Sequence, residues 1–75
     1  MMFSYERIEE DLFSKELGKF SSFGISVYLI VDEKHLIGVA SDVSDDINLV
    51  DRIVGYCNKK QINPLQLLNT VGLFI

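Results

Sequence analysis

The stretch Ser44-Asp-Asp-Ile-Asn-Leu-Val-Asp-Arg-Ile-Val-Gly-Tyr-Cys-Asn-Lys-Lys-Gln61 decides the fold. Read at 3.6 residues per turn, it predicts a helix whose apolar side covers about half of the circumference, wider than the stripe of an ordinary surface helix. The apolar residues are Ile47, Leu49, Val50, Ile53, Val54, Tyr56 and Cys57. A helix of this kind needs a large apolar partner, and the neighbouring segments predict a sheet before it and a second helix after it.

Two strands precede the helix. Residues 19–31 alternate, and the face we expect to point to the core carries Phe23, Ile25, Val27, Leu29 and Val31. Residues 32–35 have the length of a polar hairpin turn. Residues 36–43 then return as a strand, with Ile37, Val39 and Val43 expected to point to the core. The pair is an antiparallel hairpin with one apolar face that the helix can cover.

The N-terminal segment has two interpretations. Phe3, Tyr5 and Arg7 alternate with other residues as in an edge strand, whereas Tyr5, Ile8 and Leu12 have helical spacing. A strand over 2–9 is our prediction, on the strength of the resemblance described below, with residues 10–18 as a connector that ends in a glycine turn. A helix over residues 4–17 is the alternative.

Capping residues set the helix ends. Ser44 is expected as the N-cap of the first helix, with Asp45 and Asp46 in its first turn. Asn63-Pro64-Leu65-Gln66 is typical of the start of a second helix, with Asn63 as cap and Gln66 reaching back to it. The prediction is one α+β domain over residues 1–75: an antiparallel meander of about three strands (2–9, 19–31, 36–43), covered on one face by an αα-hairpin (45–60, 64–75).

Composition narrows the classes of function. The 75 residues carry a net charge of −4, which repels phosphate backbones and anionic lipid, so we expect neither nucleic acid nor membrane as a partner. No apolar run approaches the roughly 20 residues of a membrane span, and the N-terminus does not resemble a signal peptide. With a single cysteine, Cys57, the chain fits a reducing compartment, and we predict a cytoplasmic protein.

No catalytic, cofactor-binding or metal-binding set is predicted. His35 falls in the expected hairpin turn and Cys57 on the buried helix face, so no pattern brings a nucleophile and a base together. Asp42, Asp45 and Asp46 lack the glycine and the distal glutamate of a calcium loop. The glycines are scattered and form no phosphate-binding loop. The sequence therefore predicts a protein without enzymatic activity and without cofactors.

Interaction with another protein is the leading hypothesis. A small domain buries only about 60% of its unfolded surface, and this chain is 48% hydrophobic. We expect a protein-interaction or regulatory module that acts as a homodimer, with the partner contacting Leu68, Val71, Phe74 and Ile75 of the second helix. One alternative is an enzyme or ligand-binding protein whose carboxylate site forms across a dimer interface. Another is an acidic decoy that binds a basic protein.

Four short motifs stand out: Gly18-Lys-Phe-Ser-Ser-Phe-Gly-Ile25, Val43-Ser44-Asp45, Cys57-Asn58 and Pro64-Leu65-Gln66-Leu67. In these motifs the chain resembles an uncharacterised family of small proteins from Gram-positive-type bacteria. The resemblance implies the α+β layout and no activity. The family has His where this chain has Gln66, and Asp where it has Asn69. These two residues mark either a lost site or only a way of capping the helix.

Overall fold

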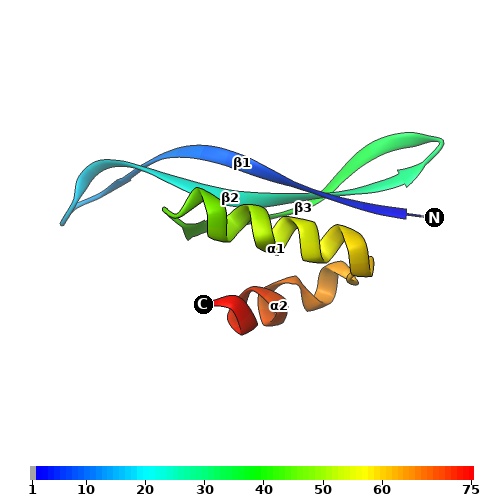
Figure 1. Ribbon diagram of the computed structural model, residues 1–75. Helices are drawn as coiled ribbons and strands as arrows, with labels where there is room; N and C mark the ends of the chain where they lie inside the picture. The colour runs from blue at the N-terminus through cyan, green and yellow to red at the C-terminus, as the bar shows by residue number, and fades with distance from the viewer. Residues whose placement is uncertain (1) are drawn as a thin grey trace.

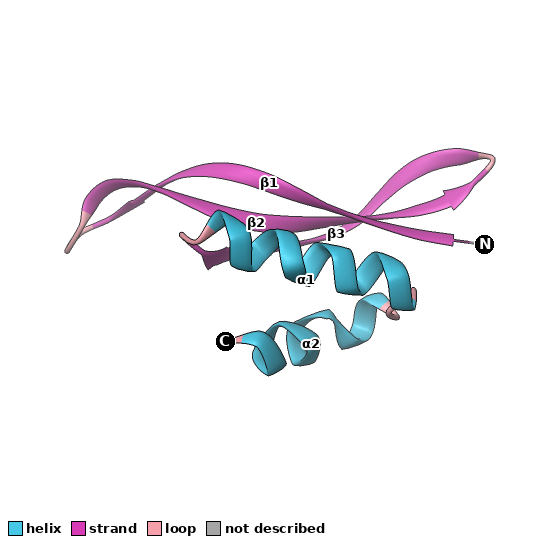
Figure 2. Ribbon diagram, viewed as in Figure 1, coloured by secondary structure: helices cyan, strands magenta, loops and turns pink. Residues whose placement is uncertain are grey.

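The computed structural model describes residues 2–75 and has an α+β fold (Figures 1 and 2). Three antiparallel strands lie in the order β1-β2-β3. The strands are β1 (Met2–Ser14), β2 (Gly18–Val31) and β3 (Glu33–Ser44), followed by α1 (Ile47–Lys60), the short 3-10 helix η1 (Pro64–Gln66) and α2 (Leu67–Phe74). The predicted meander with an αα-hairpin on one face is confirmed. No helix within residues 2–75 is long and apolar enough to cross a membrane.

The core lies between the sheet and α1. Strands β1 and β2 supply Tyr5, Ile25 and Val27, and residues directly opposite each other on neighbouring strands share a face. Within the described residues 2–75, the buried apolar residues are Tyr5, Ile25, Val27, Ala40, Val50, Ile53, Cys57 and Leu67. The apolar face of α1 is therefore buried along its centre, whereas Ile47 and Tyr56 at its margins are partly exposed.

The first hairpin is longer than expected, and the predicted connector over residues 10–18 is wrong. Strand β1 continues to Ser14, which pairs with Gly18. Gly18 has a φ of 69°, which glycine adopts at little cost, and the Ser14 hydroxyl accepts a hydrogen bond from Leu17 N at 2.9 Å. This hairpin arm projects beyond the helices (Figure 1). Because no helix covers it, its sequence lacks the apolar alternation of a half-buried strand.

The second hairpin turn is tighter than expected, and the predicted four-residue turn is wrong. Val31 already pairs with Glu33 around Asp32, whose φ is 65°. Lys34 and His35 therefore belong to β3, where they lie opposite Ile30 and Leu29. The polar character of this segment reflects its exposure at the end of the sheet and not a loop conformation.

The predicted core positions on β3 are also wrong in part. Ala40 lies opposite Ile25 and Gly38 opposite Val27, so these two small residues face the helices. Ile37 and Val39 are 47% and 52% exposed. Irregularities in the β2–β3 pairing explain this shift, because an extra residue reverses the side-chain alternation. Val43, beyond the second irregularity, packs against the core as expected.

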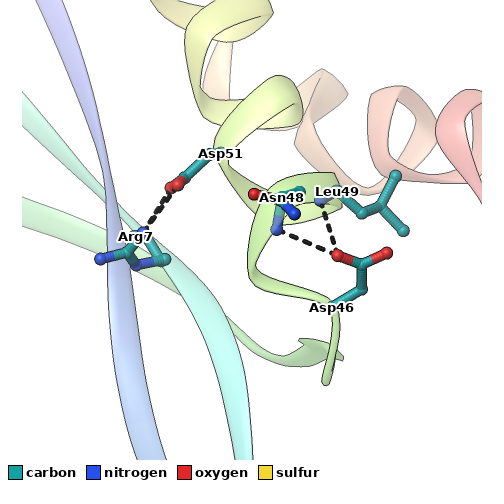
Figure 3. A network of polar contacts seen from close by, with 5 residues as sticks. All are labelled: Arg7, Asp46, Asn48, Leu49 and Asp51. Atoms are coloured by element: carbon teal, nitrogen blue, oxygen red, sulfur yellow. Dashed lines mark hydrogen bonds and ion pairs between the residues drawn. The ribbon is translucent and has the colours of Figure 1, made fainter.

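Helix α1 begins at Ile47 with Asp46, not Ser44, as its N-cap (Figure 3). An Asp46 carboxylate oxygen accepts hydrogen bonds from Asn48 N at 3.0 Å and Leu49 N at 3.2 Å. The Ser44 hydroxyl instead accepts from Asp46 N at 3.0 Å. The predicted cap and the predicted acidic first turn are therefore wrong by two residues, because Ser44 still belongs to β3.

The second helical segment starts where the sequence indicates. Asn63 Oδ1 accepts a hydrogen bond from Leu65 N at 2.9 Å, and Pro64 takes the first helical position. The first turn is a 3-10 helix, however, and α2 proper starts at Leu67. Gln66 does not reach back to Asn63; its side-chain oxygen accepts from Asn69 Nδ2 at 3.3 Å. The predicted reciprocal cap is therefore absent from residues 63–66.

Candidate interaction surface

The C-terminal helical segment exposes several large apolar side chains. We call Leu65, Leu68, Leu73 and Ile75 the C-terminal apolar surface; they are 88%, 74%, 81% and 70% exposed. Leu68 and Ile75 were among the predicted partner contacts. Leu65 and Leu73 were not among the predicted contacts. No charged side chain occurs in residues 61–75.

The other two predicted contacts, Val71 and Phe74, lie on the inner side of α2. Both are half-buried and pack against the core. The Phe74 ring meets the Tyr56 ring edge to face, with centroids 5.4 Å apart and an interplanar angle of 64°. These two residues hold α2 on α1 and thereby fix the position of the exposed leucines, so the four predicted residues divide between both sides of one helix.

A groove runs between β3 and the start of the second helical segment. It is lined on the strand side by Ile37–Ala40 and on the helical side by Pro64, Leu65, Leu67 and Leu68. The lining contains no charged side chain. The groove joins the C-terminal apolar surface to the free edge of the sheet, so exposed apolar groups and unpaired strand backbone lie side by side.

The two edges of the sheet differ in how their outward backbone groups are bonded. At the β1 edge, Asn58 Oδ1 accepts from Tyr5 N at 2.7 Å, and Asn58 Nδ2 donates to Tyr5 O at 2.9 Å. Gln61 makes the same pair of bonds with Phe3, at 2.9 Å each. Two side-chain amides of α1 and its C-cap thus replace a fourth strand and block this edge between Phe3 and Tyr5.

The β3 edge has no such cover. Between Glu33 and Ala40, no backbone group bonds to any element other than β2 within the described residues 2–75. The centre of this strand is Leu36-Ile-Gly-Val-Ala40, without proline or charge. A long apolar edge of this kind is a template for pairing with another chain.

The outer face of the sheet, away from the helices, carries a polar cluster. Glu10 reaches across β2 above Gly24 and accepts from Asp42 N and from the Ser41 hydroxyl, both at 2.8 Å. The Ser22 hydroxyl donates to Asp42 Oδ1 at 2.6 Å. These bonds hold β3 where Asp42 adopts a φ of 51°. The carboxylates are acceptors for groups of the fold itself, which is a structural role.

A second charged contact lies on the same face near the β2–β3 turn. The Lys34 ammonium pairs with Glu6 and lies 4.2 Å from the centroid of the Tyr28 ring. The hydrogen bond to Glu6 raises the pKa of Lys34 above its ordinary value.

On the helix side, Arg7 Nη1 lies 2.7 Å from both Asp51 oxygens and so links β1 to α1 (Figure 3). Exposed pairs of this kind contribute little to stability, because solvent screens them.

The nucleophile and the base discussed above lie apart in the fold. Cys57 is fully buried in α1, and burial raises the pKa of its thiol. His35 is exposed on β3. Among residues 2–75 no three His, Cys, Asp or Glu side chains converge in a way that could hold a metal ion.

The hairpin arm presents a separate hollow of about 440 Å³ near its tip. It is lined by Asp11, Leu12, Phe13, Lys19, Phe20 and Ser21. Phe13 and Leu17 are 72% and 71% exposed here. The arm is a second apolar surface, remote from the β3 edge along the sheet (Figure 1).

Comparison of the chain with protein-family models, with curated proteins and with solved structures found no match. The resemblance to an uncharacterised bacterial family therefore stays a prediction.

Proposed function

We propose that this protein is a non-catalytic, cytoplasmic interaction module that works as a homodimer. The observation that carries the proposal is the C-terminal apolar surface: Leu65, Leu68, Leu73 and Ile75 are each at least 70% exposed. Leu65 and Leu68 line one groove, and apolar groups gathered at a protein surface mark association sites. One self-complementary patch is enough for a symmetric dimer, because each copy presents it to the other.

Charge favours a second copy as the occupant. The chain has a net charge of −4, so most contacts between two copies bring acidic groups together. Residues 61–75 carry no charged side chain. Association through this segment therefore buries apolar area without placing like charges against each other. The need for added stability in so small a domain points in the same direction.

The test is the solution mass, measured by light scattering after size exclusion over a range of protein concentrations. The proposal expects twice the mass of the 75-residue chain. Leu68→Glu should weaken the dimer at least about 100-fold, because an unpaired carboxylate in an interface costs several kcal/mol and 1.4 kcal/mol is a factor of ten. Leu68 is 74% exposed, so this variant should keep the fold and the circular dichroism of the monomer.

Leu17→Glu is the matched control, since Leu17 is a leucine of similar exposure, 71%, on the hairpin arm. It should leave the dimer intact. A chain that stays monomeric at every concentration contradicts the proposal, and a dimer split by Leu17→Glu but not by Leu68→Glu contradicts the surface we assign. The alternatives of a carboxylate site across a dimer and of an acidic decoy stay predictions.

A further inference from the structure

We infer that two copies of the chain join through their β3 edges, in an antiparallel register that places Gly38 of one copy opposite Gly38 of the other. This inference rests on the proposed homodimer and specifies its interface. The result is a continuous six-stranded sheet with the helices of both copies on one face. Four observations support it: the open edge, its position beside the apolar helix, the sequence symmetry of β3, and the placement of two opposite charges.

Beside the helices, β3 is the edge of the sheet that is left open. On β1, the backbone groups of Phe3 and Tyr5 are already bonded by the Gln61 and Asn58 side chains. An incoming strand would have to break these four bonds. On β3, residues 33–40 bond only to β2 within the described chain. Pairing there adds hydrogen bonds without removing any.

The symmetry of an antiparallel pair restricts the register. A two-fold axis perpendicular to the sheet places one residue opposite its own copy and keeps the same face of both copies together. With Gly38 at the axis, Ile37 lies opposite Val39 of the second copy, and this pair occurs twice. The exposed Ile37 and Val39 side chains then cover each other.

The charged side chains of β3 favour this register over the two registers whose axis is shifted by one residue. With Gly38 at the axis, Lys34 of one copy lies toward Asp42 of the second copy at both ends of the shared edge, beyond the two irregularities of the β2–β3 pairing. Both side chains lie on the outer face, since Lys34 contacts Glu6 and Tyr28, and Asp42 contacts Ser22. A register centred on Ile37 would place Lys34 opposite Ala40, and one centred on Val39 would place Leu36 opposite Asp42. Neither pairs opposite charges.

The helical segments complete the interface on the other face. Leu65 and Leu68 line the groove beside Ile37–Ala40, so a second β3 strand at this edge also meets these leucines. The β2–β3 pairing is irregular on both sides of Gly38–Ala40, which keeps the regular part of the ladder short. We therefore expect the backbone ladder to set the register and the leucines to contribute much of the affinity.

A charge exchange tests the register. In a homodimer of Lys34→Glu, two acidic side chains face each other at both ends of the interface. In a homodimer of Asp42→Lys, two lysines face each other at both ends. Mixed together, the two variants form a heterodimer in which both pairs attract. We expect the heterodimer to bind at least about 5-fold tighter than either homodimer at low ionic strength, with the preference shrinking in high salt. Native mass spectrometry or fluorescence transfer between labelled copies measures this.

The matched control is a mixture of Lys15→Glu and Glu16→Lys, which change the net charge by the same amounts on the hairpin arm, away from β3. It should give a statistical mixture of homodimers and heterodimers.

A second measurement uses Ile37→Cys and Val39→Cys in a Cys57→Ala background. Residues directly opposite on antiparallel strands have Cα atoms about 4.5–5.5 Å apart, within disulfide range. The mixture should form a disulfide-linked dimer, and either variant alone should form far less.

The outcomes separate the two proposals. A wild-type dimer with a preferred charge-exchanged heterodimer and the mixed disulfide supports both. A wild-type dimer with statistical mixing and no preferred disulfide overturns the β3 register and leaves the homodimer standing. A wild-type chain that is monomeric at every concentration overturns both.

Discussion

The side-chain amide of Asn58 pairs with the backbone of Tyr5 as a neighbouring strand would. It accepts from Tyr5 N at 2.7 Å and donates to Tyr5 O at 2.9 Å, across 53 residues of sequence. The contact fixes the C-terminal half of α1 on β1. It also satisfies two backbone groups that would otherwise form an open edge.

Replacing Asn58 with alanine should lower the free energy of unfolding by about 2–3 kcal/mol. Each lost hydrogen bond contributes about 1 kcal/mol, and the Tyr5 backbone groups are left unpaired in a half-buried place. Urea unfolding at a fixed protein concentration measures the change. Lys59→Ala, at the exposed neighbouring position, should change it by less than about 0.5 kcal/mol. Equal effects of the two variants would contradict the assigned role of Asn58.

Asp46→Ala should cost about 1 kcal/mol, because it removes the acceptor of two N–H groups at the start of α1. Asp45→Ala is the matched control. It removes the same charge one residue earlier, where no capping contact exists within the described chain, and should cost less than about 0.5 kcal/mol. Thermal unfolding of both variants tests this. A larger loss for Ser44→Ala than for Asp46→Ala would return the cap to Ser44.

Two glycines should respond in opposite ways to alanine. At Gly24 a Cβ atom would lie 2.6 Å from the Ala40 carbonyl oxygen and 2.7 Å from Glu10 Oε1, so Gly24→Ala should destabilise by about 1–3 kcal/mol. At Gly55, inside α1, a Cβ atom meets nothing within 4 Å, and Gly55→Ala should stabilise by about 0.5–1 kcal/mol. Chemical denaturation of both variants measures these two changes in the free energy of unfolding. A tolerated Gly24→Ala would show that Glu10 does not need to cross β2 at this point.

The parts of the fold that could be predicted are those in which one side faces apolar groups and the other faces water. Ile25 and Val27 on β2, and Val50 and Ile53 on α1, carry this contrast in the sequence and are buried. The arm beyond residue 10 could not be predicted from the alternation, because water surrounds both of its faces. The prediction that Ile37 points to the core was wrong for a related reason. A one-residue shift in strand pairing exchanges the two faces of the strand, and nothing in the local sequence indicates such a shift.

The candidate surface shows the same limit. The stripe of Leu68 and Ile75 was visible at helical spacing, but Val71 and Phe74 share enough of that spacing to be confused with it. Only the position of α2 on α1 separates the inner side from the outer side. The capping of β1 by Asn58 left no pattern at all, because a side-chain amide that bonds to a distant strand looks like any other polar residue of a helix.

Alkaline pH should destabilise the protein through Tyr5 and Cys57. Burial, with a contribution from Cys57, raises the pKa of Tyr5 from 10.0 to about 12, and burial raises the pKa of Cys57 from 9.0. Both groups therefore keep their protons in the folded chain at a pH where the unfolded chain loses them. Since the unfolded state then binds fewer protons, the free energy of unfolding falls as the pH rises above about 9. The Tyr5 part should reach about 2–3 kcal/mol near pH 12, at 1.36 kcal/mol per pKa unit.

Tyr5→Phe separates this effect from a general sensitivity to base. The Tyr5 hydroxyl donates to the Ile62 carbonyl oxygen, so the variant should lose about 1 kcal/mol at pH 7. Between pH 9 and 11, however, its stability should fall less steeply than that of the wild type, because the buried phenol no longer titrates. Urea unfolding at each pH gives both slopes. Parallel slopes would place the alkaline loss elsewhere in the molecule and remove Tyr5 as its cause.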